Sequence, residues 1–160
     1  MAGRQQLSFQ ITTAHEFLAK LHSEHADVES DLTSARHAIN AAMTAYHLIE
    51  WVWGINVKRD ATIKSTLSVD SKNDFRDYCL RACPELETMQ CICEGSKHLG
   101  TSGKNVESSD LKGGAFSSGF SKGFDISCLK LTMADGTTSY FDVELETVVE
   151  FWDKFFKTHL

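Results

Sequence analysis

The chain has 160 residues, of which 42% are hydrophobic and 24% charged, and it contains a single proline. This length suits one domain with a sizeable core, and the composition is too apolar for a disordered chain. We therefore expect a single domain over residues 1–160. The net charge of −6 excludes a general nucleic-acid coat, although five lysines against three acids make residues 95–130 locally basic.

The N-terminal segment and the cysteines indicate the compartment. MAGRQQLSFQ lacks the basic region and apolar stretch of a secretory signal, so we expect a cytoplasmic protein. Five cysteines, an odd number without an export signal, favour free thiols. Residues 38–57 are long enough for a membrane span, but Asn40, His47 and Glu50 lie near their middle, where one charge costs roughly 2.5–3.5 kcal/mol. We expect no membrane partner.

Apolar residues at spacings of three and four predict two helices at the start of the chain. The first covers residues 12–28 and the second about 32–57, with Ser30 or Asp31 as the N-cap between them. The apolar stripe keeps nearly the same phase across this junction. A single long helix is therefore an open alternative.

Two shorter helices and a loop are expected next. After the polar segment 58–72, Asp70 and Ser71 suit the start of a helix at about 73–82. Pro84 suits the first turn of another helix, which should end near Gly95. Seven glycines and seven serines lie within residues 95–123, which predicts a long flexible loop over residues 99–123.

The C-terminal part alternates in hydrophobicity and then changes to a helical period. DISCLKLTM and SYFDV, joined by the turn ADGT, predict a β-hairpin over residues 124–143. Asp142 is expected to cap a last helix at 144–158. Its apolar face comprises Leu145, Val148, Val149, Trp152, Phe155 and Phe156. The expected fold class is mainly α: a bundle of four to five helices over residues 12–98, with a C-terminal β-hairpin and a closing helix.

Polar residues of the second helix share one side of it. On a helical wheel, an arc of about 80° holds Arg36, Asn40, Met43, His47 and Glu50. A solvated face is one interpretation, since most polar stripes on helices are solvated. Between residues 38 and 57 this arc lacks Lys and Arg, which favours a covered pocket or a subunit seam. Arg36, Asn40, Thr44 and Trp51 are the candidate ligand-binding residues.

Two groups of residues are candidates for catalysis. A buried Glu50 one turn from His47 would accept a hydrogen bond from the imidazole and favour its protonated form, as in a general acid. Such a pair can equally be structural. Lys97 and His98 follow at the expected end of a helix, where cations also complement the helix dipole. The candidate catalytic residues are therefore His47, Glu50, Lys97 and His98.

Two groups of residues could in principle bind a metal ion, but we do not expect a metal site. The cysteines near His98 are Cys79, Cys83, Cys91 and Cys93. Their Cx3C and CxC spacings do not match structural zinc sites, and the first two fit core positions. His22 and His25 could face His47 and Glu50 in a bundle metal site, but surface positions suit these two histidines better. No cofactor is expected, and neither GxGxxG nor a phosphate-binding loop ending in Gly-Lys-Ser/Thr occurs.

Two motifs carry a resemblance to a protein family. TAYHLIEW and CICEGSKHLG together resemble an uncharacterised group of small bacterial helical proteins. In that group one helix reads Thr-Ala, one residue, His, two residues, an acid and Trp, and a later helix ends in Asn-Gly-small-Lys-His. The match covers residues 32–100, and the hairpin and last helix fit the same arrangement. Glu94 stands where the group has Asn.

The helical order also resembles, more remotely, the HEPN superfamily. Its ribonucleases use an Arg, a polar residue, three variable residues and a His near a helix end, and they act without metal across a homodimer. Here the His is His98 and the polar residue is Glu94. Cys93 occupies the Arg position, so the resemblance implies a helical dimer more than it implies cleavage. Lys97 or Arg36 could supply the missing charge if the fold brings either one there.

Two functions follow as hypotheses. The first is a HEPN-like homodimeric domain that binds or acts on RNA or another phosphate-bearing ligand; if it acts on RNA, the resemblance implies a metal-independent ribonuclease. Lys97 and His98 would then face the phosphate, with His47 and Glu50 in support. The second is a non-catalytic interaction module with a protein partner surface around Trp51 and Trp53.

Overall fold

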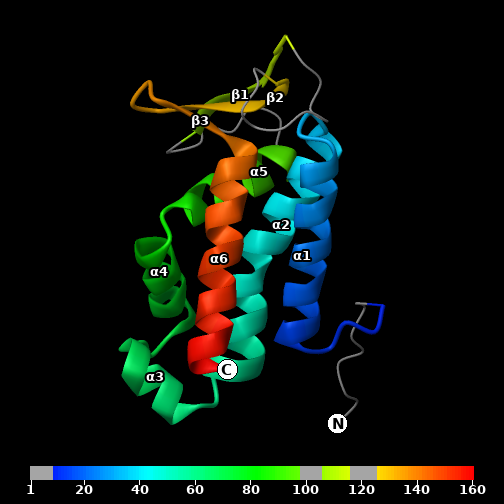
Figure 1. The fold of residues 1–160 in the computed structure, drawn as a ribbon. Coiled ribbons are helices and arrows are strands. Elements are labelled where there is room, and N and C mark those ends of the chain that lie inside the picture. The colour runs from blue at the N-terminus through cyan, green and yellow to red at the C-terminus, as the bar shows by residue number, and fades with distance from the viewer. Residues whose placement is uncertain (1–8, 98–105, 116–125) are drawn as a thin grey trace.

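The computed structural model describes residues 9–97, 106–115 and 126–160 and is mainly helical, as expected (Figure 1). Its helices and strands follow in chain order. They are α1 (Ala14–Ser30), α2 (Ala35–Val52), the π-helical turn η1 (Trp53–Val57), α3 (Ala61–Leu67), α4 (Lys72–Ala82), α5 (Glu85–Lys97), β1 (Val106–Lys112), β2 (Cys128–Met133), β3 (Thr138–Tyr140) and α6 (Phe141–His159).

Helices α1, α2 and α6 lie side by side, and the sheet crosses one end of this bundle (Figure 1). Helix α5 packs on α2 and α6 near the same end, while α4 packs on α2 and α5. The N-terminus of α6 and the C-terminal part of α5 therefore both lie close to the sheet. Among the described helices, none is both long enough and apolar enough to cross a membrane.

Helices α1 and α2 are separate, as the sequence favoured, but the expected N-cap is wrong. Ser34 caps α2 by accepting a hydrogen bond from the His37 backbone N–H at 3.3 Å. Asp31 instead closes α1, and its carboxylate accepts from the backbone N–H of Thr33 at 3.0 Å. The residues that were expected to begin α2 therefore lie in this turn. An Asp carboxylate that accepts from the backbone N–H two residues later favours a turn over a helix.

At its other end, α2 does not continue as an α-helix to Val57. The backbone N–H of Lys58 donates to the carbonyl of Trp53 at 2.9 Å, which closes one wider π-turn. Trp53 and Val57 are both buried, so the wider turn keeps these two apolar side chains on the core. The sequence pattern predicted a continuous helix to Val57 and missed this change of helix type.

The polar segment 58–72 contains a helix, α3, that the sequence pattern did not predict. The carboxylate of Asp60 caps it by accepting from the backbone N–H groups of Thr62 and Ile63. It is short and its buried residue is Leu67, so it has too few apolar positions for a periodic signal. Ser71 caps α4 through a two-sided capping box with Asp74, which confirms the expected start of that helix.

The sheet is larger than the expected hairpin. β2 and β3 form the predicted hairpin, whose turn contains Gly136 at a φ of 82°. β1 adds an antiparallel edge strand to β2 and lies within the segment expected to be a flexible loop. Residues 99–105 and 116–123 of that segment lie outside the described part of the chain. β1 was missed because its side chains are almost all exposed and do not alternate in polarity.

Helix α6 begins earlier than expected. Phe141 and Val143 were predicted in the second strand, but β3 ends at Tyr140 and both residues lie in the helix. Asp142 lies in the first turn and is not the N-cap, which is Tyr140 without a side-chain bond. An acidic residue in the first turn suits the helix dipole, so the residue supports the helix start from a different position.

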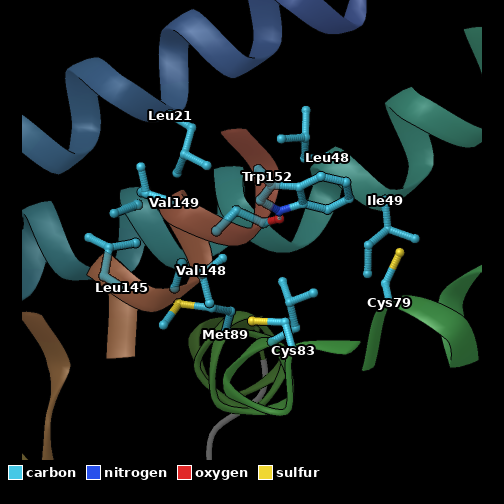
Figure 2. Packing of buried hydrophobic residues seen from close by; sticks show 14 of the residues in the cluster. Leu21, Leu48, Ile49, Cys79, Cys83, Met89, Leu145, Val148, Val149 and Trp152 are labelled. Atoms are coloured by element: carbon cyan, nitrogen blue, oxygen red, sulfur yellow. Dashed lines mark hydrogen bonds between the residues drawn. The ribbon is translucent and has the colours of Figure 1, made fainter. Parts of the chain in front are cut away.

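One hydrophobic core joins the helices to the sheet, and the predicted apolar face of α6 lies entirely within it. Figure 2 shows side chains from α1, α2, α4, α5 and α6 converging around the indole of Trp152. That indole N–H donates to the carbonyl of Ala45 at 3.2 Å, so its polar atom is satisfied inside the core. Cys79 and Cys83 occupy core positions, as expected. All five cysteines are free thiols.

Candidate functional site on α2 and α5

The predicted polar arc of α2 is on the surface of the single chain, although its middle is partly covered. Arg36, Asn40 and Glu50 are exposed, whereas Met43 and His47 are half-buried. The solvated-face interpretation therefore describes the two ends of the arc. The half-buried middle is where α5 packs against α2.

His47 and the C-terminal part of α5 meet. The Nε2 atom of His47 lies 3.6 Å from the Sγ atom of Cys93, within the range of a weak hydrogen bond to sulfur. Lys97 follows Cys93 by four residues on α5, which places it on the same side of that helix. One residue from each predicted group, His47 and Lys97, is thus near the other, with Cys93 as the direct contact of His47. His98 lies outside the described residues.

Burial and charge both favour the neutral form of His47. Partial burial lowers the pKa of its imidazole, the positive charge of Lys97 lowers it further, and Lys20 of α1 acts in the same direction. The carboxylate of Glu50 raises the pKa, with an effect smaller than that of burial or of Lys97 but larger than that of Lys20. The expectation that Glu50 would keep His47 protonated is therefore wrong.

Glu50 has a different partner from the expected one. Its carboxylate forms an ion pair with Lys72 of α4, with 2.6 Å between Oε1 and Nζ. Both side chains are about half exposed, at 51% each. A pair of this kind is worth about 0–1 kcal/mol because water screens it. Glu50 is thus a surface residue that links α2 to α4. The described polar contact of the His47 ring is with Cys93.

Cys93 is a buried thiol and stays protonated. Its side chain is 2% exposed, and burial raises the pKa of the thiol. Lys97 lowers that pKa and Glu94 raises it, both less strongly than burial. A thiolate–imidazolium pair needs a low thiol pKa and a high imidazole pKa, and both groups are shifted the other way. The contact therefore joins a neutral thiol to a neutral imidazole.

Lys97 is the cation of this group that is available to a ligand. It is exposed, and within the described ranges it has no acidic partner at ion-pair distance. Lys20, by contrast, forms an ion pair with Glu24 at 2.6 Å and donates to the hydroxyl of Thr44 at the same distance. The positive charge of Lys20 lowers the pKa of His47, but the carboxylate of Glu24 partly balances it.

Thr44, a predicted ligand-binding residue, is buried and its hydrogen bonds are internal. Its hydroxyl accepts from Lys20 and donates to the carbonyl of Asn40 at 2.9 Å. It therefore joins α1 to α2 in this structure. Arg36 and Asn40 are exposed near the other end of α2, and the Arg36 guanidinium lies 3.2 Å from the ring of His37.

Trp51 is half-buried and stacks on Phe17 of α1, with ring centroids 4.6 Å apart and planes 12° from parallel. One face of the indole is thus occupied by a neighbour. Trp53, the second member of the expected partner surface, is 8% exposed and belongs to the core. An apolar surface built from both tryptophans is therefore not present.

The histidines and cysteines considered as metal ligands include one close pair, His47 and Cys93, in the described part of the chain. Within those residues, no group of three or more His, Cys, Asp or Glu side chains is placed to hold a metal ion. Cys79 and Cys83 are in the core, and His22 lies 2.9 Å from Asp153 of α6.

Two adjoining pockets lie elsewhere, between β1 and the helices α2 and α5. Their volumes are about 310 and 320 Å³, and both are lined by Ile39, Ile92 and Ser109. Among the described residues, none of the predicted site residues lines either pocket.

Cys93 and Lys20 are the site residues whose roles the sequence pattern missed. Cys93 was weighed as a zinc ligand and as the replaced Arg position, and not as the partner of His47. Its spacing of four residues from Lys97 was the available signal, because it places both side chains on one face of α5. Nothing in the sequence indicates the contact between Lys20 and Thr44, since it joins residues 24 positions apart.

Comparisons with known proteins give no assignment: no family model, curated protein or solved structure matches the chain.

Proposed function

We propose that the chain is a HEPN-like, homodimeric helical domain that binds RNA or another phosphate-bearing ligand on the face that carries His47 and Lys97. The observation that carries the proposal is an exposed cation, Lys97, that has no acidic partner among the described residues and lies near a half-buried histidine whose pKa is lowered. Lysine is a point charge that binds phosphate oxygens, and an imidazole N–H can donate to the same group. Two helices hold these side chains, which fits recognition of a small anionic group.

The geometry favours binding over cleavage. A metal-independent ribonuclease needs a positioned acid or base together with a fixed cation at the phosphate. Here the expected supporting carboxylate, Glu50, is paired with Lys72, and the described cation is a flexible lysine. Incubation of the purified chain with mixed RNA, with and without chelator, tests this preference directly. Chelator-resistant cleavage by a homogeneous preparation would contradict it.

RNA binding is tested with Lys97→Glu and with a matched control, Lys157→Glu. Lys157 is an exposed lysine in the last turn of α6. We expect the Lys97 change to weaken binding of a labelled single-stranded RNA, measured by fluorescence anisotropy. The slope of log affinity against log salt should fall by about 0.7 for each lost phosphate contact. Equal weakening by both variants, or by neither, would refute a site at Lys97. Light scattering on the same samples measures the mass, and the proposal expects a dimer.

The alternative function, a non-catalytic interaction module, has one observation in its favour. Polar residues of α2 join helices, because Glu50 pairs with Lys72 and Thr44 bonds Lys20. The buried position of Trp53 counts against it, since the expected partner surface is incomplete. Absence of RNA binding in the wild type, with a dimer in light scattering, would favour this module.

A further inference from the structure

The contact between His47 and Cys93 restricts where the imidazole proton can be. Neutral imidazole carries one proton, on either Nδ1 or Nε2, and the other nitrogen is an acceptor. A thiol has one proton and is a weak donor. The Sγ atom of Cys93 lies 3.6 Å from Nε2 of His47. A thiol can donate to Nε2 when the ring proton is on Nδ1.

The other ring nitrogen is open to water. Within the described residues, the buried side-chain nitrogen and oxygen atoms that lack a partner are Nδ1 of His37 and Oδ1 of Asn56. Nδ1 of His47 is not one of them, and among the described residues the ring has no hydrogen bond besides the contact with Cys93. Nδ1 of His47 therefore reaches solvent, on a half-buried ring.

We propose that Cys93 is a positioning residue that holds His47 in the tautomer protonated on Nδ1. The buried thiol donates to Nε2, and the solvent-facing nitrogen then presents an N–H donor. The protonation states agree with this arrangement, because burial raises the pKa of the Cys93 thiol and lowers the pKa of the His47 imidazole. Both partners thus remain neutral.

This assignment deepens the proposed function and rests on it for the nature of the ligand. A histidine that offers N–H to solvent can bind an oxygen of a phosphate group, but it cannot remove a proton from that ligand. The nitrogen with the free electron pair is turned to the buried thiol. Cys93 thereby makes His47 a donor beside Lys97, which suits a site that binds a phosphate ester and leaves it intact.

The tautomer is measured by long-range ¹H–¹⁵N NMR of histidine-labelled full chain, at a pH above the ordinary histidine pKa of about 6.5. We expect His47 of the wild type to be protonated on Nδ1. Cys93→Ser keeps a donor and should keep this tautomer. Cys93→Ala removes the donor and should populate the Nε2-protonated form. Cys91→Ala, at a half-buried position on the same helix, is the matched control and should change nothing.

Two outcomes would overturn the proposal: an Nε2-protonated His47 in the wild type, or an unchanged tautomer in Cys93→Ala. Since Cys93 is buried, circular dichroism establishes that each variant is folded. If the alanine variant does not fold, the tautomers of the wild type and of Cys93→Ser still decide the matter. Titration with inorganic phosphate separates the two proposals. Failure to bind phosphate or RNA refutes the proposed function, while the tautomer is read without any ligand.

Discussion

At His47 the surroundings resist protonation from two sides. The ring is half-buried between α2 and α5, and the charges of Lys97 and Lys20 lie near it. Glu50 acts in the opposite direction but is itself paired with Lys72. A folded chain with neutral His47 is therefore favoured over one with charged His47. This couples the stability of the domain to mild acid.

The pH dependence has a defined sign. The pKa of His47 is lower in the folded chain than in the unfolded chain, so the unfolded chain binds the proton more tightly. This contribution to stability is complete above about pH 6.5, the unfolded value, and is lost as the pH falls below it. We expect the urea midpoint of the wild type to fall from pH 7 to 5.5, and His47→Gln to flatten this fall.

Four carboxylates affect stability at a lower pH than His47 does, so the two contributions can be distinguished. Hydrogen bonds to neighbouring backbone and hydroxyl groups lower the pKa of Glu16, Asp31, Asp74 and Asp135. Their stabilisation is present above the usual carboxyl pKa of about 4 and is lost below it. An unchanged pH profile in His47→Gln would show that other groups control stability between pH 7 and 5.5.

The sequence supported the choice of residues better than their pairing. His47 and Lys97 could be selected because a polar residue in an apolar helix and a cation at a helix end are local features. The expected bond between Glu50 and His47 was wrong because spacing along one helix does not reveal competition from Lys72 of another helix. Cys93 could not be identified as a partner of His47 without the angle at which α5 crosses α2.

At the scale of elements, helix starts depend on single side chains. Ser71 begins α4, and its hydroxyl accepts from the Asp74 backbone N–H at 3.2 Å while the Asp74 carboxylate bonds the Ser71 backbone N–H at 2.8 Å. Each bond satisfies a backbone donor that the first turn of a helix leaves free. Because α4 carries Lys72, this cap also places the partner of Glu50.

Removal of this cap should destabilise the chain measurably. We expect Ser71→Ala to lower the free energy of unfolding by about 1 kcal/mol, within a usual range of about 0.5–2 kcal/mol for lost N-caps. Ser65→Ala, at an exposed position inside α3, is the control and should change stability by less than about 0.5 kcal/mol. Urea unfolding followed by circular dichroism measures both. Equal effects would mean that the cap contributes nothing specific.

The elements predicted best were those with long apolar stripes or strong caps, namely α1, α2, α4, α5, α6 and the hairpin. β1 was not predictable because an exposed edge strand shows no alternation of polar and apolar residues. β1 is a strand because it pairs with β2. The two strands are not adjacent in the sequence, so no local pattern indicates this pairing. The start of α6 was misplaced because a strand and a helix meet there without an intervening turn.

For the whole molecule, the buried cluster extends from α1 to the sheet without a break. Leu131 of β2 is 1% exposed and belongs to the same cluster as Trp152 of α6. A domain with one core is expected to unfold in one transition. The sheet should therefore share the stability of the bundle.

Leu131→Ala tests this unity. The change should cost about 2–5 kcal/mol, as loss of a buried leucine does, and should shift tryptophan fluorescence and far-UV circular dichroism together. Leu111→Ala is the control on the neighbouring strand, where the side chain is 61% exposed and the cost should stay below about 0.5 kcal/mol. Separate transitions for the two probes would show that sheet and bundle unfold independently.

The backbone N–H of Leu129 in β2 donates to the carbonyl of Leu32, at the corner between α1 and α2, at 3.0 Å. This bond fastens the sheet to the bundle without using any side chain. Nineteen of the twenty amino acids supply the same N–H at position 129, and proline does not. This bond can therefore persist while the side chain at position 129 changes, so the main chain helps to place the sheet alongside the packed side chains of the core.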